Sequence, residues 1–378
     1  MTRVWDIPVH DSTRVRDARV AAEDAAALAG LAPSRAADAA LVATELATNL
    51  LRHACGGQLL VEAVGPPNGC ADGLVVQMAA IDHGPGMSDV PAALGDGFST
   101  AGSLGAGLGT CRRLADDFDL HSVPGRGTVA LARIGGTART RGHRDRVTEQ
   151  APEHAAGQAG EATHSTPGNV SVPAPFAVRV GGVNVPFRGA EHSGDAWTCA
   201  GDGDRLTLML ADGLGHGPEA ALASTAAVRE VHRSAHLPPA ELLRRLDDAL
   251  RGTRGAAVAV AQLDLRAGRL RFAGIGNVGA RLREGGSWRH LLSRPGIVGA
   301  HRPSTLPETE AAWAADRLLV LHSDGLPSRW APSADPRLLT ADPAVTAAVT
   351  VRDAGSSAWP VRDDTAVAVL SPTPPDRR

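Results

Sequence analysis

Apolar residues recur with a helical period in some segments and in alternating or continuous runs in others, and together they predict a first folded region at residues 1–134. The predicted strands lie at residues 4–9, 59–64, 74–81, 119–122 and 128–134. The predicted helices lie at residues 15–29, 34–54 and 109–117. This order of elements predicts an α+β domain in which helices cover a sheet.

Large apolar residues are almost absent from residues 135–175, which are rich in Gly, Ala, Pro, His and charge. Such a segment cannot bury a core, so we expect a flexible linker there.

Strands dominate the region after the linker, residues 176–372. The pattern predicts them at residues 177–180, 197–200, 205–211, 256–263, 270–275, 279–283, 317–322 and 365–370. Helices are predicted near residues 218–235 and 240–250. A strand-rich core with a few helices predicts a β-sandwich flanked by helices, and hence a second domain.

The composition argues against a nucleic-acid-binding protein and against a membrane-spanning protein. The chain has 378 residues, 43% of them hydrophobic, and a net charge of −3, which gives no electrostatic footprint for nucleic acid. Its four cysteines contain no C-x-x-C pair, and no apolar run is long enough to span a bilayer. We therefore expect a cytoplasmic protein without nucleic-acid or membrane partners.

The first region carries four polar or glycine-rich motifs in order. Glu45, Asn49 and His53 share one face of a predicted helix. An aspartate follows a strand in Asp82-His-Gly-Pro-Gly, and a glycine-rich run, GSLGAGLG, leads directly into a helix. The segment GRGT then opens the last strand. Glycine-rich backbone at a helix N-terminus offers N–H groups to phosphates, so the set predicts a nucleotide site.

With these motifs, and with the stretches ELATNLLRHA and GAGLGTCRRLADDFDLHSVPGRGTVA, residues 4–134 resemble the GHKL ATPase superfamily, specifically the serine kinases of anti-sigma and stressosome switches. The resemblance implies a Bergerat-type α/β sandwich that binds ATP and Mg²⁺. It implies Asn49 as a metal ligand, Glu45 as the catalytic base and Asp82 as the reader of the adenine amino group. The other implied nucleotide-binding residues are Gly84, Gly86, Gly105, Gly107, Gly109 and Thr128. Nothing resembles a histidine-kinase acceptor helix, which disfavours autophosphorylation on histidine.

The second region carries aspartates beside glycine or beside another acid, and most of them adjoin a predicted strand. These are Asp195, Asp212, Asp324 and the adjacent pair Asp363 and Asp364. Hard divalent cations prefer several oxygen ligands, and aspartates at the edges of strands in one fold can converge on such ions. The pattern predicts hydrolysis of a phosphate ester by a two-metal site.

With these aspartates and the segments FAGIGNVGARL and RPGIVG, residues 176–370 resemble the protein phosphatase 2C-like family, in its SpoIIE-type branch. The resemblance implies that Asp212 bridges two Mn²⁺ or Mg²⁺ ions and takes part in catalysis. It implies that Asp195 and the Gly213 carbonyl complete one ion, and that Asp324 and Asp363 complete the other. Whether Asp363 or Asp364 is the ligand stays open. His216 is either a proton donor to the leaving serine oxygen or a structural turn residue.

Together the resemblances imply a bifunctional regulator of a bacterial partner-switching pathway. It would phosphorylate and dephosphorylate serine or threonine on STAS-domain proteins, the anti-anti-sigma or stressosome phosphoproteins. The alternative is a phosphatase whose first domain only senses ATP or docks a partner. Kinases of this type often dimerise, so a homodimer stays open, as does any contact between the two domains.

Overall fold

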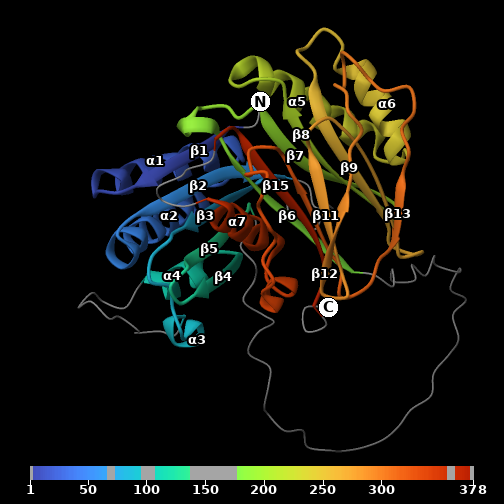
Figure 1. Cartoon of the computed structure of the whole chain (residues 1–378). Coiled ribbons are helices and arrows are strands. Elements are labelled where there is room, and N and C mark those ends of the chain that lie inside the picture. Colours follow the sequence, from blue (N-terminus) through green and yellow to red (C-terminus); the bar gives the residue numbers. More distant parts are fainter. Residues whose placement is uncertain (1–2, 66–72, 95–106, 137–176, 356–361, 375–378) are drawn as a thin grey trace, which may run out of the picture.

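The computed structural model describes residues 3–65, 73–94, 107–136, 177–355 and 362–374. Three five-stranded sheets and their helices stack in layers, with the first domain on one side and the second on the other (Figure 1). Among the described residues no helix combines the length and the apolarity needed to cross a bilayer. Most of the predicted linker, residues 137–175, lies outside the described residues.

The sheet of the first domain is antiparallel, in the order β1-β2-β3-β5-β4. Its strands are β1 (Val4–Val9), β2 (Gly57–Val64), β3 (Val75–Ile81), β4 (Asp117–Val123) and β5 (Gly127–Ile134). Its helices are α1 (Thr13–Leu28), α2 (Pro33–Ala54), the short α3 (Val90–Ala93) and α4 (Gly107–Leu114).

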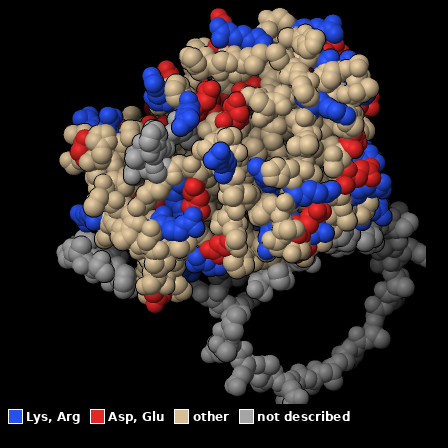
Figure 2. Space-filling view, viewed as in Figure 1, with Lys and Arg blue, Asp and Glu red and all other residues tan. Residues whose placement is uncertain are grey.

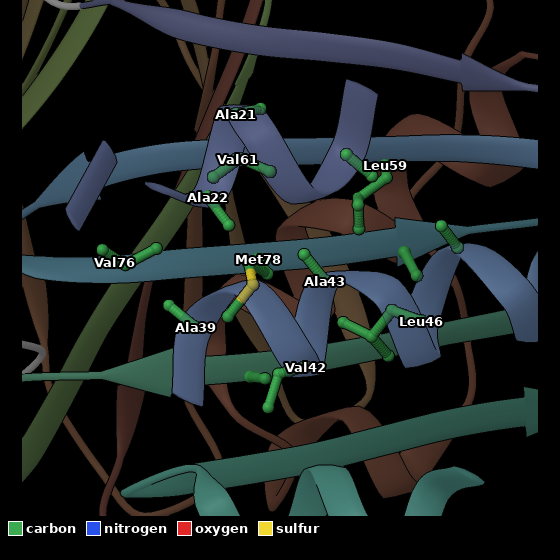
Figure 3. Close-up of a cluster of buried hydrophobic side chains, with 14 of the residues drawn as sticks. Ala21, Ala22, Ala39, Val42, Ala43, Leu46, Leu59, Val61, Val76 and Met78 are labelled. Atoms are coloured by element: carbon green, nitrogen blue, oxygen red, sulfur yellow. The ribbon is translucent and has the colours of Figure 1, made fainter. Parts of the chain in front are cut away.

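Helices α1, α2 and α4 pack on one face of this sheet. Small alanines on α1 and α2 let the helices approach closely, and Leu46, Leu59 and Met78 fill the space between helix and strand (Figure 3). This core covers only one face of the sheet. The side chains of the other face need a different covering layer.

The second domain contains two facing antiparallel sheets. The order in the first is β13-β10-β9-β8-β7, and in the second it is β12-β11-β14-β15-β6. The strands are β6 (Val178–Val185), β7 (Asp195–Asp202), β8 (Arg205–Gly213), β9 (Ala256–Asp264), β10 (Arg269–Ile275), β11 (Gly279–Glu284), β12 (Ser287–Leu291), β13 (Thr309–Ala312), β14 (Leu318–His322) and β15 (Thr365–Pro372). Leu208, Phe272 and Leu319 belong to the apolar core between the sheets.

Helices α5 (Pro218–Ser234) and α6 (Pro239–Ala249) cover the outer face of the β8–β9 sheet and enclose a further apolar core. Short 3-10 helices lie at η1 (Phe187–Gly189) and η2 (Pro336–Leu339). The predicted class, α+β with an α/β sandwich followed by a helix-flanked β-sandwich, is confirmed by this architecture.

Helix α7 (Pro343–Ala354) joins the two domains. It lies between the uncovered face of the first sheet and the outer face of the β6–β15 sheet. Its apolar residues, among them Val345 and Val349, pack with Leu60 and Leu131 of the first domain and with Val183 and Val367 of the second. The two domains therefore share one hydrophobic core and one helical layer.

The sequence pattern missed α7, and it also missed β12 and β13, so the prediction of only two helices in the second domain was wrong. The segment PAVTAAVTVRDA is rich in Val and Thr, which have low helix propensity, and nearly every residue is buried, so no polar face shows the helical period. A usable signal was the start of the helix, where the Asp342 side chain accepts the Ala344 amide and Pro343 occupies the first turn.

The strand predicted at residues 177–180 is also longer than expected, because β6 continues to Val185 through Gly181 and Gly182. A Cβ on Gly182 would meet the Trp197 ring at 2.7 Å, so a side chain has no room there. The glycines look like a strand terminator in the sequence, but in the structure they allow close packing.

Polar side chains cross the domain boundary where α7 begins. The guanidinium of Arg133, on β5, donates to both carboxylate oxygens of Asp342 at 2.7 and 2.9 Å. Its Nε donates to Gln77 Oε1 at 2.9 Å, and the Gln77 amide donates to the Gly182 carbonyl of β6 at 2.9 Å. Because all four residues are buried, the hydrogen bonds satisfy groups that would otherwise be costly to bury.

Glu62, on β2, is the neighbour of Gln77 in this buried row, and burial raises the pKa of its carboxyl to about 8. In the unfolded chain the carboxyl ionises near 4.5, so between these values the unfolded state binds fewer protons than the folded one. We therefore expect the free energy of unfolding to fall as the pH rises from about 4.5 to 8, on the order of 1 kcal/mol per pH unit. Denaturant unfolding across this range checks it. Glu62→Gln should flatten the slope, and an unchanged slope would contradict the assignment.

Candidate metal centre and nucleotide site

The predicted acidic residues come from the ends of four strands. Asp195 begins β7 and Asp212 lies near the end of β8, where the two are directly paired neighbours. Asp324 follows β14, and Asp363 and Asp364 precede β15. Because the β7–β8 and β14–β15 ends meet, the structure brings together residues up to 169 positions apart, from Asp195 to Asp364.

These acids raise one another's pKa values. The pKa of Asp212 is raised to about 7, first by burial and then by the carboxylates of Asp324, Asp363 and Asp364. The pKa of Asp195 is raised well above its usual range by burial and by Asp212. A divalent cation among these carboxylates would relieve both the repulsion and the cost of burying charge.

Asp195 provides the clearest sign that a cation fits. The residue is 1% exposed, and neither carboxylate oxygen has a hydrogen-bond partner of normal geometry among the described residues. Within that same part of the chain no three His, Cys, Asp or Glu side chains form a ready-made cage for one ion. Ions here would therefore need waters and backbone oxygens as additional ligands, which suits Mg²⁺ and Mn²⁺.

The glycine after Asp212 is needed because neighbouring backbone comes very close. A Cβ on Gly213 would meet the Ala220 carbonyl oxygen at 2.3 Å. The amide of Gly213 donates to the Gly194 carbonyl at 3.0 Å. At the other Asp-Gly pair, a Cβ on Gly325 would lie within 2.1 Å of the Thr365 hydroxyl. Gly213 and Gly325 therefore allow close backbone packing beside Asp212 and Asp324, in addition to allowing a turn.

Asp363 and Asp364 occupy different environments. The two oxygens of Asp364 accept the amides of Phe187 and Gly194, each at 2.8 Å, and its side chain is buried. Asp363 is exposed, and its Oδ1 accepts the Asp364 amide at 2.9 Å. This geometry supports Asp363 as a metal ligand and Asp364 as the residue that ties three segments together.

Sequence reasoning gave no role to two residues at this centre. The Asn277 amide donates to Asp324 Oδ2, and the Ser323 hydroxyl, beside Asp195, accepts the Ala366 amide at 2.9 Å. Asn277 lies within the quoted segment FAGIGNVGARL, so the signal was present. His216 is exposed, with its ring tilted against Phe187 at 6.3 Å between centroids.

The predicted nucleotide-binding residues lie on α2, directly after β3, in α4 and in β5. Glu45 and Asn49 are half-buried on α2, and His53 is exposed. A Cβ on Gly107 would lie 3.2 Å from Asn49 Oδ1, so the start of α4 reaches the asparagine side chain. The buried Asn49 Nδ2 has no hydrogen-bond partner among the described residues. An amide in this state fits a ligand-binding position.

Asp82 anchors the floor of that site. Its Oδ1 accepts the amides of Gly84 at 2.8 Å and Thr128 at 3.1 Å. Burial raises the pKa of this carboxyl, and the two amides oppose the increase. Gly86 and Gly127 have no room for a side chain, since a Cβ would meet a carbonyl oxygen at about 2.1 and 2.0 Å.

Of the remaining predicted nucleotide-binding residues, Gly109 is buried in α4, whereas Gly105 lies outside the described residues. Helix α7 also reaches this site. The carbonyl oxygen of Arg352 is 3.0 Å from His83 Nε2. The guanidinium of Arg352 donates to the Gly127 carbonyl at 3.3 Å.

A cavity of about 910 Å³ lies between the domains, and each domain contributes part of its wall. Residues 54–57 and His83 line it next to the nucleotide site, and residues 186–189 and Arg362 line it next to the acidic residues. On the face shown in Figure 2, acidic and basic residues are interspersed instead of forming one basic region. The cavity itself is formed by both domains together.

A family model matches each half of the chain. The family described as "Stage II sporulation protein E (SpoIIE)" matches residues 202–371, and "Histidine kinase-like ATPase domain" matches residues 9–133. Residues 9–133 are therefore similar to histidine kinase-like ATPase domains and residues 202–371 to the SpoIIE family, which confirms the fusion that the sequence motifs indicated.

Individual relatives agree with this division. The serine/threonine-protein kinase RsbT of Bacillus subtilis (strain 168) is 44% identical over 89 residues, which cover 24% of this chain and 64% of the kinase. The chain thus spans less than two thirds of that relative's length.

Two solved structures are similar over about half of this chain. A chain described under "The bacterial stressosome: a modular system that has been adapted to control secondary messenger signaling" is 30% identical, covering 51% of this chain and 99% of its own, with a TM-score of 0.46. RsbX in complex with magnesium is 20% identical, covering 52% of this chain and 96% of its own, with a TM-score of 0.44. With both scores below 0.5, the architecture rests on the sheets and helices described above.

Proposed function

We propose that this chain is a cytoplasmic, bifunctional regulator of a bacterial partner-switching pathway. Its second domain would remove phosphate from serine or threonine of a STAS-domain protein, and its first domain would use ATP to add it. The observation that carries the phosphatase proposal is the convergence of five aspartates from four strand ends. One of them is Asp195, whose buried carboxylate has no hydrogen-bond partner of normal geometry among the described residues.

In the proposed hydrolysis, two divalent cations would be held by Asp195, Asp212, Asp324, Asp363 and the Gly213 carbonyl. Two such ions would supply a nucleophilic water near neutral pH and neutralise charge on the phosphoryl oxygens. Asn277 orients Asp324 by hydrogen bonding, and Asp364 fixes the loops that carry Phe187 and Gly194. His216, which is exposed and tilted against Phe187, would either give a proton to the leaving serine oxygen or act only as a structural turn residue.

The phosphatase proposal is tested by phosphate release from a STAS-domain phosphoprotein. We expect release in Mn²⁺ or Mg²⁺ and its loss when EDTA removes the ion. Release that continues unchanged in EDTA would contradict a metal-dependent centre.

For the first domain we propose Asn49 as a ligand to Mg²⁺, Asp82 as the adenine reader and Glu45 as the base that accepts the serine hydroxyl proton. The close match to a serine kinase supports transfer to protein. The shared α7 core supports the alternative of a non-catalytic ATP sensor, because it gives ATP binding a physical connection to the phosphatase domain.

Two variants distinguish these roles. Asn49→Ala should weaken ATP binding, whereas Glu45→Gln should keep ATP binding but reduce phosphate transfer about 10²–10⁴-fold, as loss of a general base does. The measurements are ATP calorimetry and transfer of labelled phosphate to a STAS-domain protein. Wild-type protein that binds ATP without any transfer would favour the sensor.

A further inference from the structure

A buried asparagine outside the acidic cluster connects the metal centre to the rest of the molecule. Asn184, on β6, is 1% exposed. Its Nδ2 donates to the Asp195 carbonyl at 2.7 Å, and its Oδ1 accepts the Ser193 hydroxyl at 2.8 Å. Because one side of the amide faces an acceptor and the other a hydroxyl donor, the contacts fix which atom is nitrogen.

The segment held by Asn184 is the one from which Asp195 projects. The Ser193 hydroxyl accepts the Asp195 amide at 3.1 Å, so both backbone groups of Asp195 are tied to the same small network. Gly194 is bonded on both sides, to Asp364 at 2.8 Å and to Gly213 at 3.0 Å. The Asp195 carboxylate has no partner of normal geometry among the described residues, so its position depends on this backbone network.

The strand that carries Asn184 is held in turn by the ATPase domain. β6 is the edge strand of its sheet, so alternate amides and carbonyls have no strand partner on the outer side. Two of these groups are bonded by the first domain: Gln77 donates to the Gly182 carbonyl at 2.9 Å, and Glu62 accepts the Asn184 amide at 3.4 Å.

Glu62, Gln77 and Arg133 are direct cross-strand neighbours on β2, β3 and β5, and all three are buried. The row therefore runs from Asn184 at one end to Asp342, at the start of α7, at the other. We propose that Asn184 is a positioning residue of the metal centre and that this row makes the ATPase domain a structural support for divalent-cation binding by the phosphatase domain. This inference rests on the proposed metal-dependent function.

The direct test measures Mn²⁺ binding to the full chain by calorimetry, without substrate. We expect Asn184→Ala to weaken Mn²⁺ binding about 10–100-fold, the usual cost of losing a residue that orients a ligand. Asn184→Asp keeps the acceptor for Ser193 but cannot donate to the Asp195 carbonyl, so it should also bind weakly. Excess Mn²⁺ should restore much of the phosphatase rate of either variant.

The Gln262→Met variant is the control for the effect of a general loss of stability on Mn²⁺ binding. Gln262 is another buried amide of the second domain, bonded to Thr207 and to the carbonyls of Ala235 and Leu237, away from the acidic residues. This variant should lower the unfolding midpoint while leaving Mn²⁺ affinity within about twofold of wild type. Equal losses of affinity in Gln262→Met and Asn184→Ala would overturn the positioning role.

The contribution of the ATPase domain is tested by Gln77→Leu, which removes the bond to Gly182 and should weaken Mn²⁺ binding several-fold. Gln58→Leu is the matched control, since the Gln58 amide bonds Asp6 within the first domain. Unchanged affinity in Gln77→Leu and Asn184→Ala, with Mn²⁺ still binding wild type, would overturn this inference alone. A wild-type chain that binds no Mn²⁺ would overturn the proposed metal centre as well.

Discussion

Asp212→Asn should reduce metal-dependent phosphate release by about 10²–10³-fold or more while making the metal-free chain more resistant to heat. The loss follows from the several kcal/mol that metal ions contribute to the transition state, at 1.36 kcal/mol per tenfold. The gain follows because Asp212 is repelled by Asp324, Asp363 and Asp364, so a neutral amide removes a destabilising charge. Phosphate release and thermal unfolding in EDTA measure the two effects.

Asp204→Asn is the matched control for this variant. Asp204 is an exposed acid in the β7–β8 turn, at the opposite end of the same strands, and pairs with Arg266 at 3.7 Å. Asp204→Asn should change phosphate release and thermal stability only slightly, because an exposed ion pair contributes about 0–1 kcal/mol to stability. Full activity in Asp212→Asn would remove Asp212 from the metal centre.

Arg133→Met should lower the free energy of unfolding by about 3–5 kcal/mol, because it leaves the Asp342 carboxylate buried without its cation. Burial acts to raise the pKa of Asp342, but the Arg133 charge outweighs it, so the pKa lies below the usual 3.8. The contribution of the pair is therefore present above that pH and is lost as the pH falls further. We also expect the two domains to unfold separately, since the pair joins the first sheet to α7.

Urea unfolding followed by circular dichroism measures both effects. Arg14→Met is the control, because the Arg14–Asp17 pair is exposed on α1 and should contribute little. Adding Asp342→Asn to Arg133→Met should restore part of the stability, since asparagine still caps α7 and carries no charge. A single unchanged transition in Arg133→Met would mean that the pair does not hold the domains together.

Local pattern was sufficient for most elements and for the family of each half. The 3.6-residue period of α2 and the two-residue period of strands such as β11 are visible because one face of each is apolar. The acidic and glycine-rich motifs lie at the ends of helices and strands. Gly213 and Gly325 were identifiable because the residue type itself records that no side chain fits.

The relation between the domains could not be read in this way. A helix buried on every side, such as α7, has no polar face to show its period, and its Val and Thr content favours a strand. Glu62, Gln77 and Arg133 each look like an ordinary polar residue of a strand with one solvated face. Only the packing of the second domain buries that face and supplies their partners.

The sequence by itself therefore determined the classes of the two domains and supplied the proposed chemistry of each site, because these depend on residues whose spacing follows local periods. The tertiary structure alone decided that α7 lies between the domains and that Asn184 holds Asp195. It also decided that Asp364 is tied to backbone amides while Asp363 stays exposed. These arrangements depend on contacts between residues far apart in the chain, which a local pattern does not record.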